Sequence, residues 1–397
     1  MSHAYIVAGC RTPIGKFLGG LAPVAAPELG SIAVAEALRR AGLPPSAVDE
    51  VILGNVLSAG LGQAPARQAA LRAGLPPSVA ALTINKMCGS GLKAVMLADQ
   101  AIRAGDARCI VAGGMENMSR APFLLRGARE GWKFGPQQVI DSMVHDGLWC
   151  AAENLSMGAE ADYIAAKCDV SREDQDALAV ESHRRAAQAI AARAFDAEIV
   201  PVLFQDHKRS TTISRDEGPR ADASLATLAG LKPAFEEQAG VARTVTAGNA
   251  SQLSDGAAAV VVVDERLAAE ASSPIKARIV AAATSGVPPK DVFIAPVSAV
   301  ERVLAKARLT MADIDLVELN EAFAAQTLAC QRPLGIDPAK LNVHGGAIAL
   351  GHPIGASGAR VLVTLLHALA ARGLRRGLAA LCLGGGNAVA MIVERQG

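Results

Sequence analysis

The stretch Ala33-Val34-Ala35-Glu36-Ala37-Leu38 returns near the other end of the chain as Ala299-Val300-Glu301-Arg302-Val303-Leu304. The likeness continues at the same spacing through residues 41–53 and 307–319. Each copy reads as an amphipathic helix, a short connection and a buried strand. Alanine-rich helices can look alike by chance, but one constant offset through helix, connection and strand indicates a duplicated unit.

The duplication extends further along the chain. Ser90 and Ser357 each lie in a glycine-rich turn that opens a helix rich in Ala, Leu and Val. These helices end near Gly105 and Gly373, where glycine is the usual stop, and a strand ending in glycines follows each of them. Repeated alternation of strand and helix predicts parallel βαβ units with right-handed crossovers. We therefore expect an α/β protein of two pseudo-twofold halves, with a site where their helix N-termini and glycine turns converge.

The pattern changes between residues 119 and 246. This part holds both tryptophans, Trp132 and Trp149, and a helix expected over residues 171–193 with Ser171 as its N-cap. A polar stretch follows at residues 206–222, and regular sequence resumes near residue 247. We interpret the segment as an insertion in the first half that covers the site and binds the bulk of the substrate.

Composition narrows the class of protein. The chain has 397 residues and a net charge of +1, which gives no reason to expect nucleic acid or an anionic membrane as a partner. Hydrophobic residues make up 51% and aromatic residues 3%, so the core must be aliphatic, as in helix-covered parallel sheets. The seven cysteines form no Cys-x-x-Cys pair, which fits a reducing compartment and suggests no metal site. With neither a signal peptide nor an apolar membrane span recognised, we expect a cytoplasmic, soluble protein.

Cys88 is the strongest candidate nucleophile. It lies in the run Asn85-Lys86-Met87-Cys88-Gly89-Ser90-Gly91, between an apolar segment and a helical pattern. A cysteine near the positive end of a helix is expected to favour the thiolate. Most lone cysteines are buried and inert, but the flanking glycines allow a ligand to approach closely.

Three later residues belong beside Cys88. His352 lies just ahead of the second half's equivalent helix, Asn320 follows the strand at 316–319, and Cys382 precedes Gly384-Gly385-Gly386. A histidine beside a cysteine suits covalent acyl transfer, because the imidazole removes the thiol proton or holds the ion pair. Taken singly each residue has a structural explanation, but all of them lie at glycine-rich strand ends, which packing alone does not explain.

The sequence resembles the thiolase family along essentially its whole length. The segments that carry the resemblance are residues 10–17, 62–69, 85–94, 113–119, 320–326, 345–358 and 382–386. The resemblance implies duplicated βαβ halves, two mixed sheets in an α-β-α-β-α layered core, and an inserted loop domain. It divides the chain into a first half at 1–119 plus 247–272, an insertion at 120–246 and a second half at 273–397.

The resemblance also implies roles for single residues. Cys88 takes the acyl group as a thioester, and His352 activates Cys88. Cys382 is the acid/base that removes the α-proton of acetyl-CoA in condensation and returns it in cleavage. The enolate oxygen is held by His352 and by a water positioned by Asn320, and the acyl-enzyme oxyanion by the backbone N–H groups of Cys88 and Gly384.

Coenzyme A contacts and partners follow from the same resemblance. Ser251 matches the family's pantetheine contact, and further coenzyme A contacts match Leu148, Met157, Arg220, Thr227, Ala247, Ala322 and Phe323. The resemblance implies no metal and no permanently bound cofactor; coenzyme A and acyl-CoA are substrates. It implies a homodimer or homotetramer, with tetramer contacts in residues 120–147.

Three positions depart from the pattern of acetoacetyl-forming thiolases: Ser156, Phe293 and the pair Asn387-Ala388. They place the acyl-chain preference in question and leave the Cys88, His352 and Cys382 chemistry untouched. We expect condensation of two acetyl-CoA to acetoacetyl-CoA, with cleavage of longer 3-ketoacyl-CoA in fatty-acid breakdown as the alternative. Decarboxylating ketoacyl synthases share the duplicated architecture, but they resemble Cys-His-His, which Cys382 argues against. A non-catalytic acyl-CoA-binding scaffold is the remote alternative.

Overall fold

The computed structural model describes residues 3–206 and 209–396, so residues 207–208 of the expected polar stretch lie outside the described part. Ten of the described strands form one mixed sheet. In spatial order they are β4 (Ala80–Ile84), β3 (Glu50–Gly54), β5 (Cys109–Asn117), β12 (Ser254–Asp264), β1 (Ala4–Arg11), β13 (Ala277–Gly286), β16 (Asn387–Arg395), β15 (Arg376–Leu383) and β14 (Leu316–Leu319), with β2 (Gly15–Lys16) paired to the start of β12.

The strand order reads the same outward from the centre in both directions. The central strands β1 and β13 pair antiparallel through two residue pairs, Tyr5 with Arg278 and Ile6 with Ala277. Each has one further antiparallel neighbour, β12 or β16, beyond which parallel strands follow. In the second half a single parallel bridge between Val317 and Leu341 takes the place of β4. The predicted duplication is confirmed, and the two mixed sheets are halves joined at the short β1–β13 contact.

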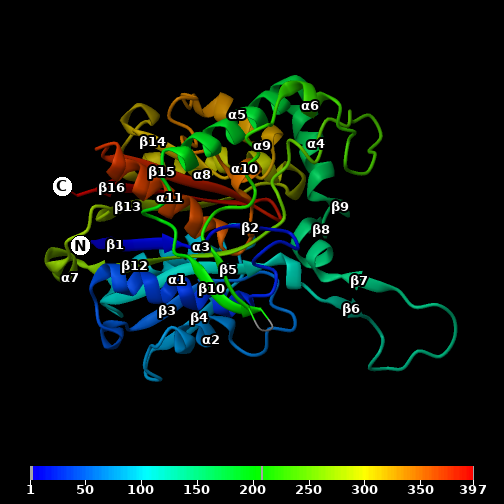
Figure 1. The fold of residues 1–397 in the computed structure, drawn as a ribbon. Coiled ribbons are helices and arrows are strands. Elements are labelled where there is room, and N and C mark those ends of the chain that lie inside the picture. Colours follow the sequence, from blue (N-terminus) through cyan, green and yellow to red (C-terminus); the bar gives the residue numbers. More distant parts are fainter. Residues whose placement is uncertain (1–2, 207–208, 397) are drawn as a thin grey trace.

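Helices separate and cover the two half-sheets (Figure 1). Helices α3 (Ser90–Ala104) and α11 (Ser357–Ala371) pack against each other and contact strands of both halves, within one core cluster of aliphatic side chains. The outer face of the first half-sheet is covered by α1 (Ala26–Ala41) and α2 (Pro65–Arg72), and that of the second by α8 (Ala295–Ala307). The layers therefore follow the predicted α-β-α-β-α order.

Glycine lets the two central helices approach each other at their first turns. A Cβ on Gly91 would lie 2.6 Å from the backbone nitrogen of Ala359, and one on Gly358 would lie 2.3 Å from that of Leu92. Any larger side chain would push the helices apart, because close-packed backbone has no room to yield. This contact brings the turns that precede α3 and α11 to the same region of the molecule.

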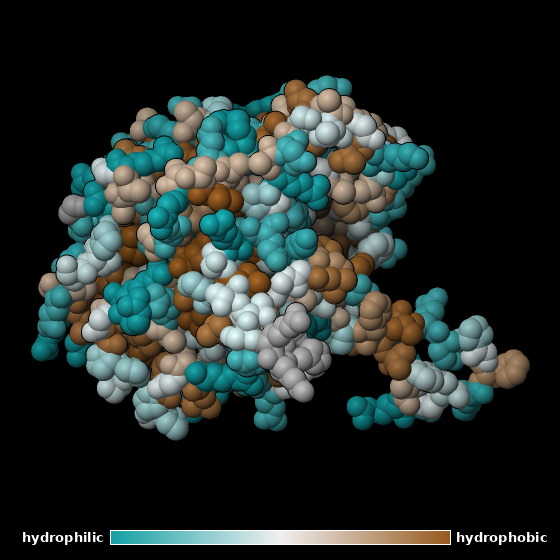
Figure 2. All heavy atoms as spheres, viewed as in Figure 1, coloured by the Kyte–Doolittle hydropathy of each residue, from teal (hydrophilic) through white to brown (hydrophobic). Residues whose placement is uncertain are grey.

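The segment between β5 and β12 leaves the layered core. Its hairpin arm of β6 (Phe123–Leu125) and β7 (Val139–Asp141) projects from the body (Figures 1 and 2). Trp132 and Phe134, in the loop that joins these strands, are exposed. Helix α5 (Arg172–Ala191) begins as predicted, with the Ser171 hydroxyl accepting from the backbone N–H of Asp174 at 3.0 Å. The other elements of this segment beyond β7 are η3 (Met143–Leu148), β8 (Trp149–Cys150), β9 (Leu155–Ser156), α4 (Met157–Lys167), β10 (Val202–Asp206), β11 (Arg209–Ile213) and α6 (Leu225–Ala229).

Short elements complete the described chain: η1 (Pro45–Ala47), η2 (Met118–Arg120), α7 (Glu265–Glu270), η4 (Pro289–Ile294), η5 (Met311–Asp313), α9 (Ala324–Leu334) and α10 (Ala347–Leu350). Within residues 3–206 and 209–396, no helix is long and apolar enough to cross a membrane. The same part of the chain contains no group of three or more His, Cys, Asp or Glu residues that could hold a metal ion. All seven cysteines are free thiols.

Candidate active site

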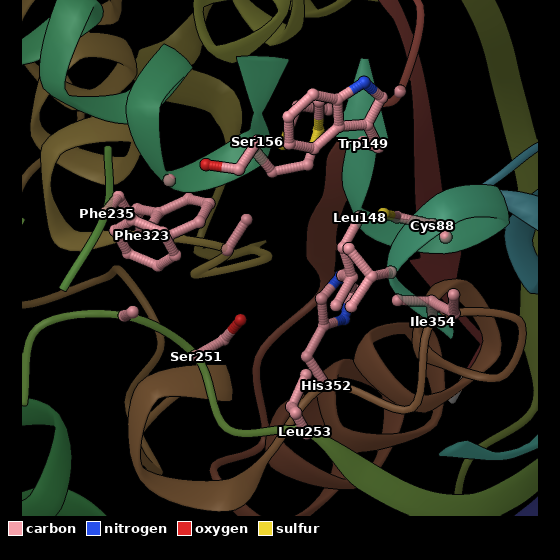
Figure 3. Close-up of a pocket in the computed structure, with 18 of the residues that line it drawn as sticks. Cys88, Leu148, Trp149, Ser156, Phe235, Ser251, Leu253, Phe323, His352 and Ile354 are labelled. Atoms are coloured by element: carbon pink, nitrogen blue, oxygen red, sulfur yellow. The ribbon is translucent and has the colours of Figure 1, made fainter. Parts of the chain in front are cut away.

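A cavity of about 580 Å³ lies where the two halves meet the insertion. Cys88 and His352 lie on one side of it, with Ser251 and the rings of Phe235 and Phe323 across the opening (Figure 3). The catalytic candidates that line it are Cys88, His352, Cys382 and Gly384. Residues from both ends of the chain thus converge on one cavity, as the duplication predicts.

The turn that carries Cys88 is held by its own side chains. Met87 adopts a positive φ of 46°, unusual for a residue with a side chain, and its N–H donates to Oδ1 of Asn85 at 3.0 Å. The Ser90 hydroxyl donates to the carbonyl of Met87 at 2.6 Å and accepts from the N–H of Lys86 at 2.8 Å. These bonds fix Cys88 in the turn between β4 and α3, two residues before α3 begins.

Burial keeps Cys88 in its thiol form. It raises the pKa of Cys88 to about 12, although the backbone N–H groups of Cys88 and Gly384 act in the opposite direction. The backbone N–H groups at this helix N-terminus favour the thiolate, as expected, but desolvation of the charged form outweighs them and the net direction is toward the thiol. A nucleophile in this position needs a base to remove its proton.

The hydrogen bonds of His352 leave one of its ring nitrogens able to accept a proton. Its Nδ1 lies 2.6 Å from the Ser357 hydroxyl, and that hydroxyl also lies 2.9 Å from the carbonyl of Pro353. Since the hydroxyl has one hydrogen, both contacts are satisfied when it donates to Pro353 and accepts from Nδ1–H. The other ring nitrogen, Nε2, then carries the free lone pair, and it has no hydrogen-bond partner among the described residues. Burial lowers the pKa of His352 to about 3, so the ring is neutral and able to accept a proton.

Cys382 and Asn320 come from neighbouring strands of the second half. Cys382 lies in β15 and lines the cavity; burial raises its pKa well above the ordinary value, and the nearby Cys88 adds to the effect. Asn320 follows β14, and its N–H donates to the carbonyl of Ala380, two residues before Cys382. Asn320 is fully buried, and neither polar atom of its side chain has a partner among the described residues. It does not line the cavity itself.

Most of the residues predicted to contact coenzyme A line the cavity, namely Leu148, Met157, Ala247, Ser251, Ala322 and Phe323. Arg220 and Thr227 do not. Both are exposed: the N–H of Arg220 donates to Nδ1 of His183 at 3.1 Å, and Thr227 belongs to the capping box that opens α6. The structure thus brings six of the eight residues together and leaves these two outside the cavity.

Three phenylalanines, not predicted from the sequence as site residues together, form an aromatic wall of the cavity. Phe235 packs edge-on against Phe323 at a centroid distance of 6.1 Å, and Phe323 packs against Phe293 at 5.1 Å. A Cβ on Gly158 would lie 2.2 Å from the ring of Phe235, so that ring requires the glycine beneath it. Phe235 lies in an irregular polar loop, and nothing in the local sequence indicates that it reaches the cavity.

Glu236 was also not predicted, and it contacts Ser156, one of the positions that depart from the family pattern. Its carboxylate accepts from the N–H and the hydroxyl of Ser156, at 2.6 and 2.7 Å. Ser156, Glu236 and Phe293 line the cavity, so these differences lie at the site itself. Asn387 does not line it; its side chain donates to the carbonyl of Gly385 at 3.2 Å.

Comparisons with known proteins agree with this geometry. The family model for the thiolase N-terminal domain matches residues 4–266, and that for the thiolase C-terminal domain matches residues 273–395. The chain is 53% identical over 396 residues to the acetyl-CoA acetyltransferase of Escherichia coli K12, covering 100% of both proteins. It is 48% identical, again over 100% of both, to a probable acetyl-CoA acyltransferase of Staphylococcus aureus. The crystal structure of the Bacillus anthracis acetyl-CoA acetyltransferase matches with a TM-score of 0.96 and 41% identity, over 100% of this chain and 99% of that one.

Proposed function

The chain belongs to the thiolase family and is an acyltransferase, and from this premise we propose that it reversibly condenses two acetyl-CoA to acetoacetyl-CoA and coenzyme A. Relatives that are about 50% identical to it along the whole chain are named acetyl-CoA acetyltransferase. The observation that carries the proposal is the convergence of Cys88, His352, Cys382 and Gly384 on one cavity. Two thiols and an imidazole there match the needs of a two-step acyl transfer.

In the first step, acetyl passes from coenzyme A to Cys88. Nε2 of His352 takes the thiol proton, and the sulfur attacks the thioester carbonyl. The oxyanion is held by the backbone N–H groups of Cys88 and Gly384, the two groups that also favour the Cys88 thiolate. Donors preorganised in this way are worth about 2.7–4 kcal/mol each in other acyl transfers. The carbon–sulfur bond to coenzyme A then breaks, and the leaving thiolate recovers the proton from His352.

In the second step, a carbon–carbon bond forms. His352, neutral again, takes the proton of Cys382, and the Cys382 thiolate removes the α-proton of a second acetyl-CoA. The enolate oxygen is held by Nε2–H of His352 and by a water on Asn320, whose buried amide has both polar atoms unpartnered among the described residues. The enolate carbon attacks the Cys88 thioester, and the expelled Cys88 thiolate takes the proton from His352.

Brief incubation with acetyl-CoA, followed by mass spectrometry and peptide mapping, tests the proposal. We expect one acetyl group on the peptide that contains Cys88, and acetoacetyl-CoA in the solution. Cys88→Ala is the control; it should form neither, and should remain folded because only a small side chain at a turn is lost. Acetylation at another residue, or product formation by Cys88→Ala, would contradict the proposal.

We propose a preference for short acyl chains. The rings of Phe235, Phe323 and Phe293 form one wall of the cavity, which favours short acyl groups. The alternative is thiolysis of longer 3-ketoacyl-CoA, as in fatty-acid breakdown. Turnover of acetoacetyl-CoA should exceed that of a medium-chain 3-ketoacyl-CoA; faster medium-chain thiolysis would overturn the short-chain preference.

We further propose that the insertion, residues 120–246, covers the bound coenzyme A between the first half (1–119 plus 247–272) and the second half (273–397). Ser251 would contact the pantetheine arm, and exposed Arg220 and Thr227 would lie nearer the nucleotide end outside the cavity. Acyl-CoA would be substrate rather than permanent cofactor, and the enzyme would act in the cytoplasm.

The hairpin arm supports a proposal about assembly. Its exposed apolar side chains, Phe123, Leu125, Trp132, Phe134 and Val139, suit a contact with another subunit. We propose a homodimer or, through this arm, a homotetramer. Analytical ultracentrifugation of the full chain gives its mass in solution and so distinguishes dimer from tetramer. If the arm joins the tetramer, Phe134→Ser should lower this mass; an unchanged mass would count against a role for the tip of the arm.

A further inference from the structure

Glu116 belongs to the segment 113–119, which the catalytic steps above do not use. It lies near the end of β5, is fully buried, and accepts four hydrogen bonds. One carboxylate oxygen accepts from the N–H of Leu57 at 3.2 Å and from Nδ2 of Asn55 at 2.8 Å. The other accepts from the N–H of Val56 at 3.0 Å and from the N–H of Gly355 at 2.9 Å.

The last of these bonds crosses between the two halves. Val56 and Leu57 follow β3 in the first half, whereas Gly355 lies three residues after His352 in the second. A Cβ on Gly355 would lie 2.7 Å from the Glu116 carboxylate, and a Cβ on Gly114 would lie 2.0 Å from the carbonyl of Gly355. The turn therefore fits closely into the first half at the point where Glu116 holds it.

A second buried carboxylate holds the other end of the stretch of chain that carries His352. Glu321 accepts from the hydroxyl of Ser182 at 2.7 Å and from the N–H of Ile348 at 3.3 Å. The Ser182 hydroxyl also accepts from the N–H of Gly346 at 3.0 Å. His352 thus lies between two points, Ile348 and Gly355, at which a buried carboxylate accepts a backbone N–H.

We propose that Glu116 is a positioning residue that fixes the turn carrying His352 against the half of the molecule that carries Cys88. This inference rests on the proposed function, in which His352 of one half must reach the thiol of the other. Glu116 acts through the backbone of the turn and does not touch the reacting atoms. Glu321 holds the opposite end of the turn within its own half.

Direct electrostatic action of Glu116 on Cys88 is the rival explanation, and it predicts the opposite sign. The negative charge of Glu116 raises the pKa of Cys88 and so disfavours the thiolate. If charge alone mattered, Glu116→Gln would make Cys88 more reactive. If Glu116 positions His352, the same variant makes Cys88 less reactive, because an amide NH2 then faces two N–H donors and the turn shifts.

The rate at which iodoacetamide alkylates Cys88, measured by peptide mass spectrometry, separates the two. We compare the unaltered protein with Glu116→Gln, His352→Ala and the double variant. We expect Glu116→Gln to lose about tenfold or more, because a displacement of ~1 Å can cost about 100-fold. We expect no further loss when it is added to His352→Ala, because residues that act through one another are not additive.

Three results would overturn the proposal: unchanged or faster alkylation in Glu116→Gln, the same fold-loss with and without His352, or no effect of His352→Ala itself. Glu394→Gln is the matched control. Glu394 lies near the C-terminal end of β16 and pairs with Arg376, so this variant should leave the alkylation rate of Cys88 unchanged. If Glu116→Gln does not fold, Gly355→Ala disturbs the same contact while keeping the charge of Glu116. Positioning then predicts slower alkylation of Cys88, whereas an effect of charge alone predicts an unchanged rate. Alkylation needs no acetyl transfer, so failure to form acetyl-Cys88 would count against the proposed function and leave this test intact.

Discussion

The turns before α3 and α11 hold equivalent places in the two halves, yet their first helical serines do different things. Among the described residues, Ser90 bonds only to the backbone of its own turn, donating to Met87 and accepting from Lys86. Ser357 also donates to its own turn, at Pro353, but its acceptor side is directed to the ring of His352. One half thus presents a sulfur on a self-contained turn, and the other presents an imidazole whose tautomer the turn determines.

This difference shows how a duplicated frame produces an asymmetric site. The repeat explains why two turns and two helix N-termini meet, but not which turn carries the nucleophile and which the base. The assignment depends on single positions, Cys88 in one turn and His352 in the other, and on the partner of one serine. Variants that treat the two halves unequally are therefore the most informative.

Removal of Cys382, the acid/base of the second half, should lower the condensation rate more than any other variant in this comparison. Cys382→Ala should still form acetyl-Cys88, but condensation should fall by about 10²–10⁴-fold, the usual contribution of a general acid/base. Exchange of the α-protons of acetyl-CoA with deuterated water, followed by NMR, reports the missing step directly. Loss of acetylation as severe as loss of exchange would show that the two thiols do not divide the work as proposed.

The paired variants Ser357→Ala and Ser90→Ala sharpen the comparison. Each removes a buried hydroxyl from the start of a central helix, so each should lower the free energy of unfolding by about 1–3 kcal/mol. Only Ser357→Ala also frees the tautomer of His352, and its kcat should fall about tenfold further than that of Ser90→Ala. Urea unfolding and steady-state kinetics measure the two effects; equal kcat values would remove the assigned role of Ser357.

A smaller effect is expected at the aromatic wall. Phe293→Leu opens the cavity beside Phe323 and should shift the ratio of medium-chain to acetoacetyl-CoA turnover upward by about 10-fold, the lower end of the range for one methylene. Phe195→Leu is the matched control, because Phe195 is equally buried and packs on His344 away from the cavity. A ratio that moves equally in both variants would assign chain preference elsewhere.

The smallest expected change is with pH. Because burial lowers the pKa of His352 to about 3 and raises that of Cys88 to about 12, neither group titrates in the neutral range. The initial rate of Cys88 acetylation should therefore stay level above about pH 8; below it, the rate should fall as Glu116, whose pKa burial raises to about 7, takes up a proton and loosens the turn that carries His352. Rapid quenching and mass spectrometry between about pH 6 and 9 give the profile. A rise with a midpoint near the ordinary histidine value that persists in Glu116→Gln would mean that the ring is solvated and charged, contrary to its burial.

The sequence alone predicted the frame of the molecule better than the electrostatics of the site. The constant offset between residues 33–53 and 299–319 predicted the paired helices and strands, and glycine-rich strand ends pointed to Cys88, His352 and Cys382. Helices, strands and turns depend mainly on neighbouring residues, so the sequence can predict them. The pKa of Cys88 is not, because it depends on how much protein the fold places around the sulfur.

Other contacts could not be predicted because they join distant segments. The bonds between Glu236 and Ser156, and between Glu116 and Gly355, span 80 and 239 residues. Phe235 reaches the cavity from an irregular loop without periodicity. Arg220 and Thr227 were predicted to contact coenzyme A by resemblance. The structure places them outside the cavity, so its lining gives no support for those two contacts.

The central claim is that the imidazole of one half activates the thiol of the other. The initial rate of acetyl transfer to Cys88, followed by rapid quenching and peptide mass spectrometry in the unaltered protein and in His352→Ala, tests it most directly. We predict a loss of about 10²–10⁴-fold in His352→Ala, with the acetyl group still on Cys88. Equal rates in the two proteins would contradict the account.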